Sequence, residues 1–171
     1  MTKYAAFLRG VNVGGVNLKM AEVATALTDA GFANVRTILA SGNVLLESSA
    51  GVAAVRKKAE ATLRDKFGYD AWVLVHDIDT VRAVVGAYPF EREVDGYQSY
   101  VTFVADNAAL DELARLDAGA EEKISRGEGV VYWQVPKGST LNSTIGKTMG
   151  KPRYKSSTTT RNLRTLAKVL R

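Results

Sequence analysis

The residues best suited to chemistry form one stretch near the N-terminus, at positions 9–19 (RGVNVGGVNLK). Glycines that follow a strand and precede a helix can present backbone N–H groups to an anion. The residues expected to contact that anion are Arg9, Gly10, Asn12, Gly14, Gly15 and Lys19. The spacing matches neither G-x-G-x-x-G nor G-x-x-x-x-G-K-[ST], so no nucleotide fingerprint is present. The alternative is that the glycines only supply positive φ angles for a tight turn.

A second candidate lies near the C-terminus, where Arg161 and Asn162 are expected at the start of the last helix, at about residues 161–170. A cation in the first turn of a helix opposes the helix dipole, and a bound anion would relieve this. We therefore expect Arg9, Asn12, Arg161 and Asn162 to form one phosphate pocket. The alternative is that a carboxylate such as that of Glu47 or Asp106 lies beside Arg161.

Two further motifs are less strongly indicated as functional sites. Ser41-Gly42-Asn43 reads as a hairpin turn. Treating strands 4–9 and 43–47 as parallel neighbours places this turn at the opposite end of the sheet from the glycine stretch. His76 stands beside Asp77, a pairing that can be catalytic or bind metal, although a structural role is the commoner one. We expect no metal site.

The charge is unevenly distributed along the chain. Of 23 lysines and arginines, nine lie in residues 129–171, which contain none of the 18 acidic residues. A basic segment suggests a polyanionic partner such as nucleic acid, and the aromatic residues Tyr132, Trp133 and Tyr154 would then stack on bases. The alternative is that this segment packs against the acidic remainder of the chain.

Composition excludes several classes. The absence of cysteine excludes disulfides and thiolate chemistry, and a single histidine leaves little room for a histidine-based metal site or triad. No apolar run approaches the ~20 residues of a membrane span, and no signal-peptide pattern is present, so we expect a cytoplasmic protein without a membrane partner. The sequence names no cofactor and leaves the oligomeric state open.

Hydrophobic periodicity predicts an α+β fold. The first half has the ferredoxin-like order β-α-β-β-α-β, with elements at about residues 4–9, 19–30, 35–40, 43–47, 52–67 and 71–76. Asn17 is expected to cap the first helix. The second, smaller α+β half begins β-α-β-β, followed by a short helix and the basic last helix. We place the boundary between residues 1–92 and 93–171, in a polar connector.

The chain resembles the bacterial proteins of domain of unknown function 1697. Four motifs carry the resemblance, which spans nearly the whole chain: residues 8–15 with Lys19-Met20, residues 41–44, Pro89-Phe90, and residues 160–162 with Thr165. The family implies a two-part α+β fold and a bacterial, cytoplasmic setting, but no function. The sequence departs from the family pattern at Val16, where a lysine is common, and at Leu163-Arg164, where a tryptophan and an asparagine are common.

Two function classes follow from these residues. The favoured one is a binding module for a phosphate-bearing ligand, nucleotide-like or nucleic acid, that uses the glycine-rich stretch and the basic helix start. The alternative is a small-molecule enzyme that uses backbone N–H groups as an oxyanion or phosphate site. A structural or interaction protein without a ligand is the third possibility.

Overall fold

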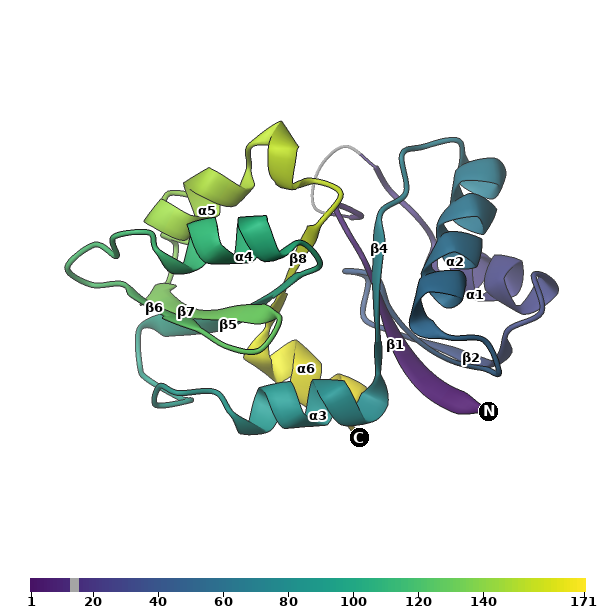
Figure 1. The fold of residues 1–171 in the computed structure, drawn as a ribbon, viewed down its shortest axis with the longest axis horizontal. Coiled ribbons are helices and arrows are strands. Elements are labelled where there is room, and N and C mark those ends of the chain that lie inside the picture. The colour runs from purple at the N-terminus through teal and green to yellow at the C-terminus, as the bar shows by residue number, and fades with distance from the viewer. Residues whose placement is uncertain (13–15) are drawn as a thin grey trace. The chain divides into compact units, whose positions relative to one another are not determined.

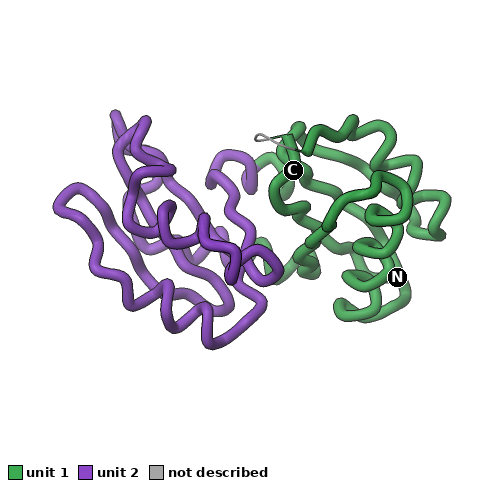
Figure 2. Tube along the Cα trace, turned by 90° about the horizontal axis from the view of Figure 1, so that it is seen from above, with its two compact units in different colours: residues 1–82, 168–171 green, residues 83–167 purple. Residues whose placement is uncertain are grey.

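The computed structural model describes residues 1–12 and 16–171. The chain forms two compact units (Figure 2). Unit 1 contains residues 1–82 and 168–171, and unit 2 contains residues 83–167. The sequence-based boundary between residues 92 and 93 lies later, in the connector that follows helix α3.

Unit 1 has the predicted β-α-β-β-α-β order, with an antiparallel sheet of strand order β2-β3-β1-β4 (Figure 1). Its elements are β1 (Thr2–Leu8), α1 (Met20–Asp29), β2 (Ala33–Ile38), β3 (Asn43–Ser48), α2 (Val52–Phe67) and β4 (Val73–Asp77). The predicted adjacency of the first and third strands is confirmed. Their predicted parallel orientation is wrong, because β1 and β3 pair antiparallel.

The core of unit 1 lies between one face of this sheet and the helices α1 and α2. Side chains alternate along β1, so Tyr4, Ala6 and Leu8 face the helices while Ala5 and Phe7 point to the other face. From the helices, apolar residues at helical spacing complete the core: Val23 and Leu27 of α1, and Val55, Ala59 and Leu63 of α2.

Unit 2 repeats the topology of unit 1, with strand order β6-β7-β5-β8 in a second antiparallel sheet. Its elements are β5 (Tyr97–Val104), α4 (Asn107–Ala114), β6 (Lys123–Arg126), β7 (Val130–Pro136), α5 (Thr144–Met149), the 3₁₀ helix η1 (Pro152–Tyr154) and β8 (Thr158–Asn162). Two helices contain residues of both units: α3 (Ile78–Gly86) and α6 (Leu163–Val169).

The last strand of unit 2 was not predicted. Residues 156–160 read as helix-capping residues, whereas the structure pairs β8 with β5 and starts α6 only at Leu163. Its threonines are β-branched and pack well in a sheet, and the Thr102 and Thr160 hydroxyls hydrogen-bond across the strands at 2.8 Å. The core lies on the face covered by α4, α5 and η1, around the buried Trp133.

Candidate functional site

Antiparallel pairing brings two of the sequence motifs to one end of the unit 1 sheet. Phe7 pairs with Asn43, and the Leu8 N–H donates to the Gly42 carbonyl oxygen at 2.8 Å. Arg9 directly follows β1 and Ser41 lies in the turn that precedes β3, so both residues lie at this end of the sheet. The expectation that the 41–43 turn lies far from the glycine-rich stretch is therefore wrong. The expectation assumed that β1 and β3 are parallel, whereas they are antiparallel.

The turn itself is held by Asn43, which is 1% exposed. Its amide nitrogen donates to the Ile38 carbonyl oxygen at 2.8 Å and to the Ser41 hydroxyl oxygen at 2.9 Å. The Ser41 side chain is thereby held within the turn at this end of the sheet. Sequence reasoning missed Ser41 and Asn43 as site residues, although an antiparallel reading of the same elements would have found them.

A glycine is required at position 42 for two reasons. Its φ of +90° is a conformation that side chains rarely adopt. In addition, a Cβ there would lie 2.7 Å from Val11 Cγ2 and 2.8 Å from Leu8 Cβ. The turn therefore packs directly against the end of β1 and the segment that follows it.

Arg9 directly follows β1 and is half-buried. Its N–H donates to the Trp72 carbonyl oxygen at 3.0 Å, which fixes the backbone between the neighbouring strands. Burial lowers the pKa of the Arg9 guanidinium from its usual range. A cation partly withdrawn from water gains more from a bound anion than an exposed one does.

Asn12 acts as a bracket within the glycine-rich stretch. Its amide nitrogen donates to the carbonyl oxygens of Leu18, at 3.0 Å, and Ala40, at 2.6 Å. Its amide oxygen accepts the Leu18 N–H at 2.9 Å. Asn12 also adopts a φ of 57°, which asparagine tolerates better than most residues. The amide thus joins the start of α1 to the 39–42 turn, which is a positioning role; the predicted ligand contact of Asn12 stays a prediction.

Lys19 is the N-cap residue of α1, and no side chain caps this helix. The prediction that Asn17 caps α1 is wrong, because the helix begins two residues later than such a cap would require. The first turn of α1 therefore combines free N–H groups with the Lys19 cation beside them and one carboxylate, that of Glu22. Gly10 is exposed with a φ of 70°. Gly14 and Gly15 lie outside the described residues.

Arg161 and Asn162 lie in β8, in unit 2, so the prediction that Arg161 occupies the first turn of the last helix is wrong. Arg161 is buried, donates to the Thr159 hydroxyl at 2.7 Å and the Thr160 carbonyl at 2.8 Å, and has its pKa lowered to about 9 by burial. Asn162 caps α6, accepting the Arg164 N–H at 2.8 Å. The predicted single pocket joins residues of both units and stays a prediction.

The aromatic residues predicted to stack on bases are buried: Tyr132 is 3% exposed, Trp133 1% and Tyr154 3%. Base stacking on them is therefore excluded by their packing in unit 2. His76 lies in β4, and burial lowers its pKa to about 4. Asp77 caps α3, and its carboxylate accepts the Thr80 N–H at 2.8 Å.

Comparison with known proteins shows the family. The chain belongs to the family described as protein of unknown function (DUF1697), whose model matches residues 1–132. The motif at residues 160–162 lies beyond this match. The search of curated proteins found no match. Among solved structures, the chain is similar to the conserved bacterial protein SP0830 from Streptococcus pneumoniae, at 22% identity and a TM-score of 0.80. The similarity covers 98% of this chain and 96% of that one, and it shows the fold.

Metal-binding clusters and membrane-spanning helices are both absent from the residues that the structure describes. No group of three or more histidine, cysteine, aspartate or glutamate side chains among them could hold a metal ion. Across residues 1–12 and 16–171, no helix is both long and apolar enough to span a membrane.

Proposed function

We propose that this protein is a binding module for a phosphate-bearing ligand, and that the ligand binds at the end of the β1–β3 pair in unit 1. One observation carries the proposal. The antiparallel register brings Arg9 and Ser41, from motifs far apart in the sequence, to the same end of the sheet as the uncapped start of α1.

The chemistry of these groups suits a phosphate. Arg9 offers a planar fork of donors that matches two phosphate oxygens, and the Ser41 hydroxyl can donate to a third. Lys19 and the N–H groups of α1 add positive field at this end. The Asn12 bracket holds the start of α1 and the 39–42 turn in place, so little order is lost on binding.

The test is a thermal-shift and titration screen of phosphate, nucleotides and sugar phosphates, with small carboxylates as the comparison. A ligand at a hundred times its Kd adds about 2.7 kcal/mol to the folded state. Arg9→Gln removes a charge-assisted bond, which costs about 1.5–3 kcal/mol of binding and abolishes most of the shift. Arg36→Gln, an exposed arginine on β2, is the matched control.

Ser41→Ala gives a second, milder test, because it removes one hydrogen bond without changing charge. It is expected to weaken binding by about 1 kcal/mol. A ligand that shifts wild type and Arg9→Gln equally binds elsewhere, and the proposal for this site would be wrong. If carboxylates bound as tightly as phosphates, the assignment of a phosphate-bearing ligand would be wrong, although the location of the site would stand.

A second candidate, nucleic acid, is supported by the basic, acid-free segment at residues 129–171. The acid-free segment exposes four cations around α5 and η1: Lys147, Lys151, Arg153 and Lys155. Because the aromatic residues are buried, only this electrostatic contribution remains. Neutralising about four phosphates of duplex DNA predicts a log–log salt slope near −3 to −4. The absence of binding to a labelled oligonucleotide at low salt would rule this candidate out.

A further inference from the structure

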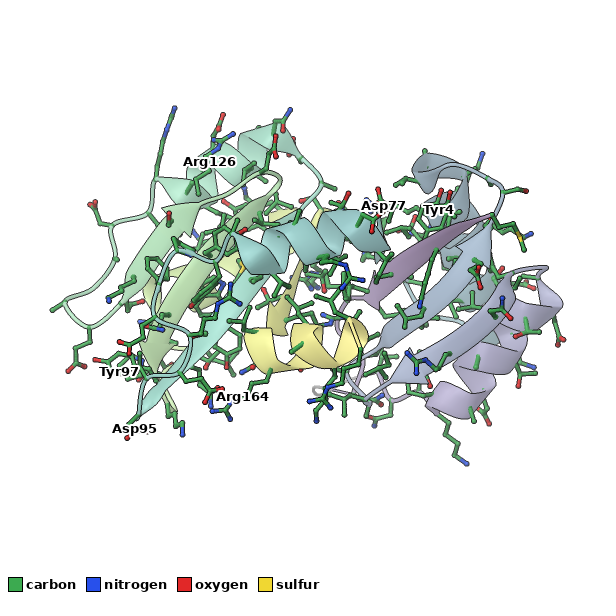
Figure 3. All side chains as sticks on the ribbon, turned by 90° about the horizontal axis from the view of Figure 1, so that it is seen from below. Tyr4, Asp77, Asp95, Tyr97, Arg126 and Arg164 are labelled. Carbon is green, nitrogen blue, oxygen red and sulfur yellow. The ribbon has the colours of Figure 1, made fainter. Side chains whose placement is uncertain are left out.

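A cavity of about 200 Å³ opens at one end of the unit 2 sheet. Its walls come from the connector at 92–94, the start of β5 at 97–99, and residues 162–164, where β8 ends and α6 begins. Figure 3 labels Tyr97 and Arg164 at this end. The volume equals that of roughly seven liquid waters and lies below the ~300–1,000 Å³ of drug-sized sites, so the cavity suits a small metabolite.

The polar lining of the cavity is built from side chains that hold one another. The buried Ser99 hydroxyl donates to the Arg92 carbonyl oxygen at 3.3 Å and accepts from the Gln134 amide nitrogen at 3.0 Å. The Asn162 amide nitrogen donates to the Gln98 amide oxygen at 2.8 Å. These bonds tie the connector, β5 and β8 together, so the cavity is a preformed part of unit 2.

Three charged side chains line this cavity: Arg92, whose Nη2 donates to the Val85 carbonyl oxygen at 2.7 Å, and the opposite charges of Glu93 and Arg164. Arg164 Nε lies 3.8 Å from Glu93 Oε1, and the two side chains are 66% and 77% exposed. This separation is well beyond the ~2.7–2.9 Å of a close charge-assisted hydrogen bond, and an exposed pair of this kind adds little to folding stability. Both groups can therefore turn to a ligand that carries the complementary charges.

The remaining wall is apolar. It consists of Val85, Val94, Leu163 and Ala167. We propose that the cavity binds a free α-amino acid with an aliphatic side chain. Its carboxylate pairs with Arg164, its ammonium pairs with Glu93, and its side chain packs on the apolar wall. A simple anion could pair with the arginines but would lie beside the Glu93 carboxylate, whereas the ammonium group of an amino acid pairs with that carboxylate.

Isothermal titration of the full chain with L-leucine tests the ligand class. Two analogues each remove one charge: 4-methylpentanoate lacks the ammonium group, and leucinamide lacks the carboxylate. We expect leucine to bind and each analogue to bind about 10- to 100-fold more weakly, the effect of one lost charge-assisted bond. Equal binding of leucine and 4-methylpentanoate would overturn the assignment of Glu93, and absence of leucine binding would overturn the proposal.

Substitutions then locate the ligand. Arg164→Gln and Glu93→Gln are each expected to weaken leucine binding about 10- to 100-fold. Arg153→Gln and Glu112→Gln are the matched controls, because this ion pair belongs to the same unit and does not line the cavity. Leucine binding that is unchanged in both rim variants, or lost equally in the controls, would contradict the site.

A third variant tests the cavity without altering charge. Ala167 is exposed on α6, so Ala167→Phe adds a ring to the cavity wall while the helix keeps its surface position. We expect it to abolish leucine binding while the unfolding temperature without ligand stays near that of wild type. Retained binding would place leucine outside the cavity. Leucine binding is expected to be unchanged in Arg9→Gln, which separates this proposal from the phosphate site of unit 1.

Discussion

Units 1 and 2 share one topology but differ at the step from their first strand to their first helix. In unit 1, β1 is joined to α1 through residues 9–19, and the helix starts at Met20 without a side-chain cap on its first N–H groups. In unit 2, β5 is joined to α4 through residues 105–106, and the Asp106 carboxylate accepts the Ala108 N–H at 3.2 Å. The carboxylate of unit 2 is thus hydrogen-bonded to the helix start, whereas the acidic residue nearest the start of α1, Glu22, lies in the first turn and makes no cap.

The neighbouring turns sharpen this difference. The Val104 N–H donates to Gly129 at 2.9 Å, as Leu8 does to Gly42. The residues of unit 2 at the positions equivalent to Arg9 and Ser41 are Ala105, after β5, and Glu128, before β7. The same backbone geometry therefore carries a cation and a hydroxyl in one unit, and a methyl group and a carboxylate in the other. The proposed phosphate site has for this reason no counterpart in unit 2.

The largest expected effect separates the two turns. Gly42→Ala combines a left-handed φ with close contacts to Leu8 and Val11, and is expected to cost about 3–4 kcal/mol of unfolding free energy. Gly129→Ala has a φ of +70° but nothing within 4 Å of the added Cβ, so about 1–2 kcal/mol is expected. Denaturant unfolding measures both. Equal losses would show that the packing of the unit 1 turn is not tighter.

A pH effect is expected in unit 1. Burial lowers the pKa of His76 to about 4, so between pH 6.5 and 4 the unfolded chain takes up the proton first. The stability contributed above pH 6.5 is therefore lost as pH falls towards 4, by about 3 kcal/mol. The corresponding position of unit 2 holds Arg161, a cation throughout this range. Hydrogen exchange that weakens equally in both units, or an unchanged pH profile in His76→Gln, would contradict this.

The Asn12 bracket has no counterpart in the short connection of unit 2. Asn12→Ala removes three hydrogen bonds, and alanine adopts a φ of 57° less readily than asparagine does. The free energy of unfolding is therefore expected to fall by about 2 kcal/mol. Asn12→Gly allows the same backbone angle, so its effect on stability reports the loss of the hydrogen bonds alone. Phosphate binding should fall in both variants, because the start of α1 is no longer held. Unchanged binding would mean that the bracket does not position the site.

Exchanging the helix caps gives the smallest expected effect on stability. Asp106→Ala removes a cap and is expected to cost about 1 kcal/mol. Lys19→Asp adds a cap to α1 and is expected to stabilise unit 1 by about 0.5–1 kcal/mol while it weakens phosphate binding. If Lys19→Asp stabilised the protein without weakening phosphate binding, the start of α1 would not be part of the site.

The sequence predicted most of unit 1 because its strands and helices have clear periods, and the change from period 2 to period 3.6 marks each boundary. It did not predict β8, because serines and threonines are favoured both at helix starts and in strands, and only pairing with β5 decides between them. Arg161 was consequently assigned to a helix. The link between Arg9 and Ser41 depends on strand direction, and the two motifs themselves carry no information on that direction.

One feature of the division into units bears on how the protein is made. All of unit 2 lies within residues 83–167, whereas unit 1 also includes residues 168–171, with Val169 buried at 2% exposure. During synthesis, domains generally form in the order in which their residues leave the ribosome. Here the whole second unit has been translated before the first receives its last four residues. The packing of Val169 in unit 1 is therefore added only after every residue of unit 2 has been synthesised.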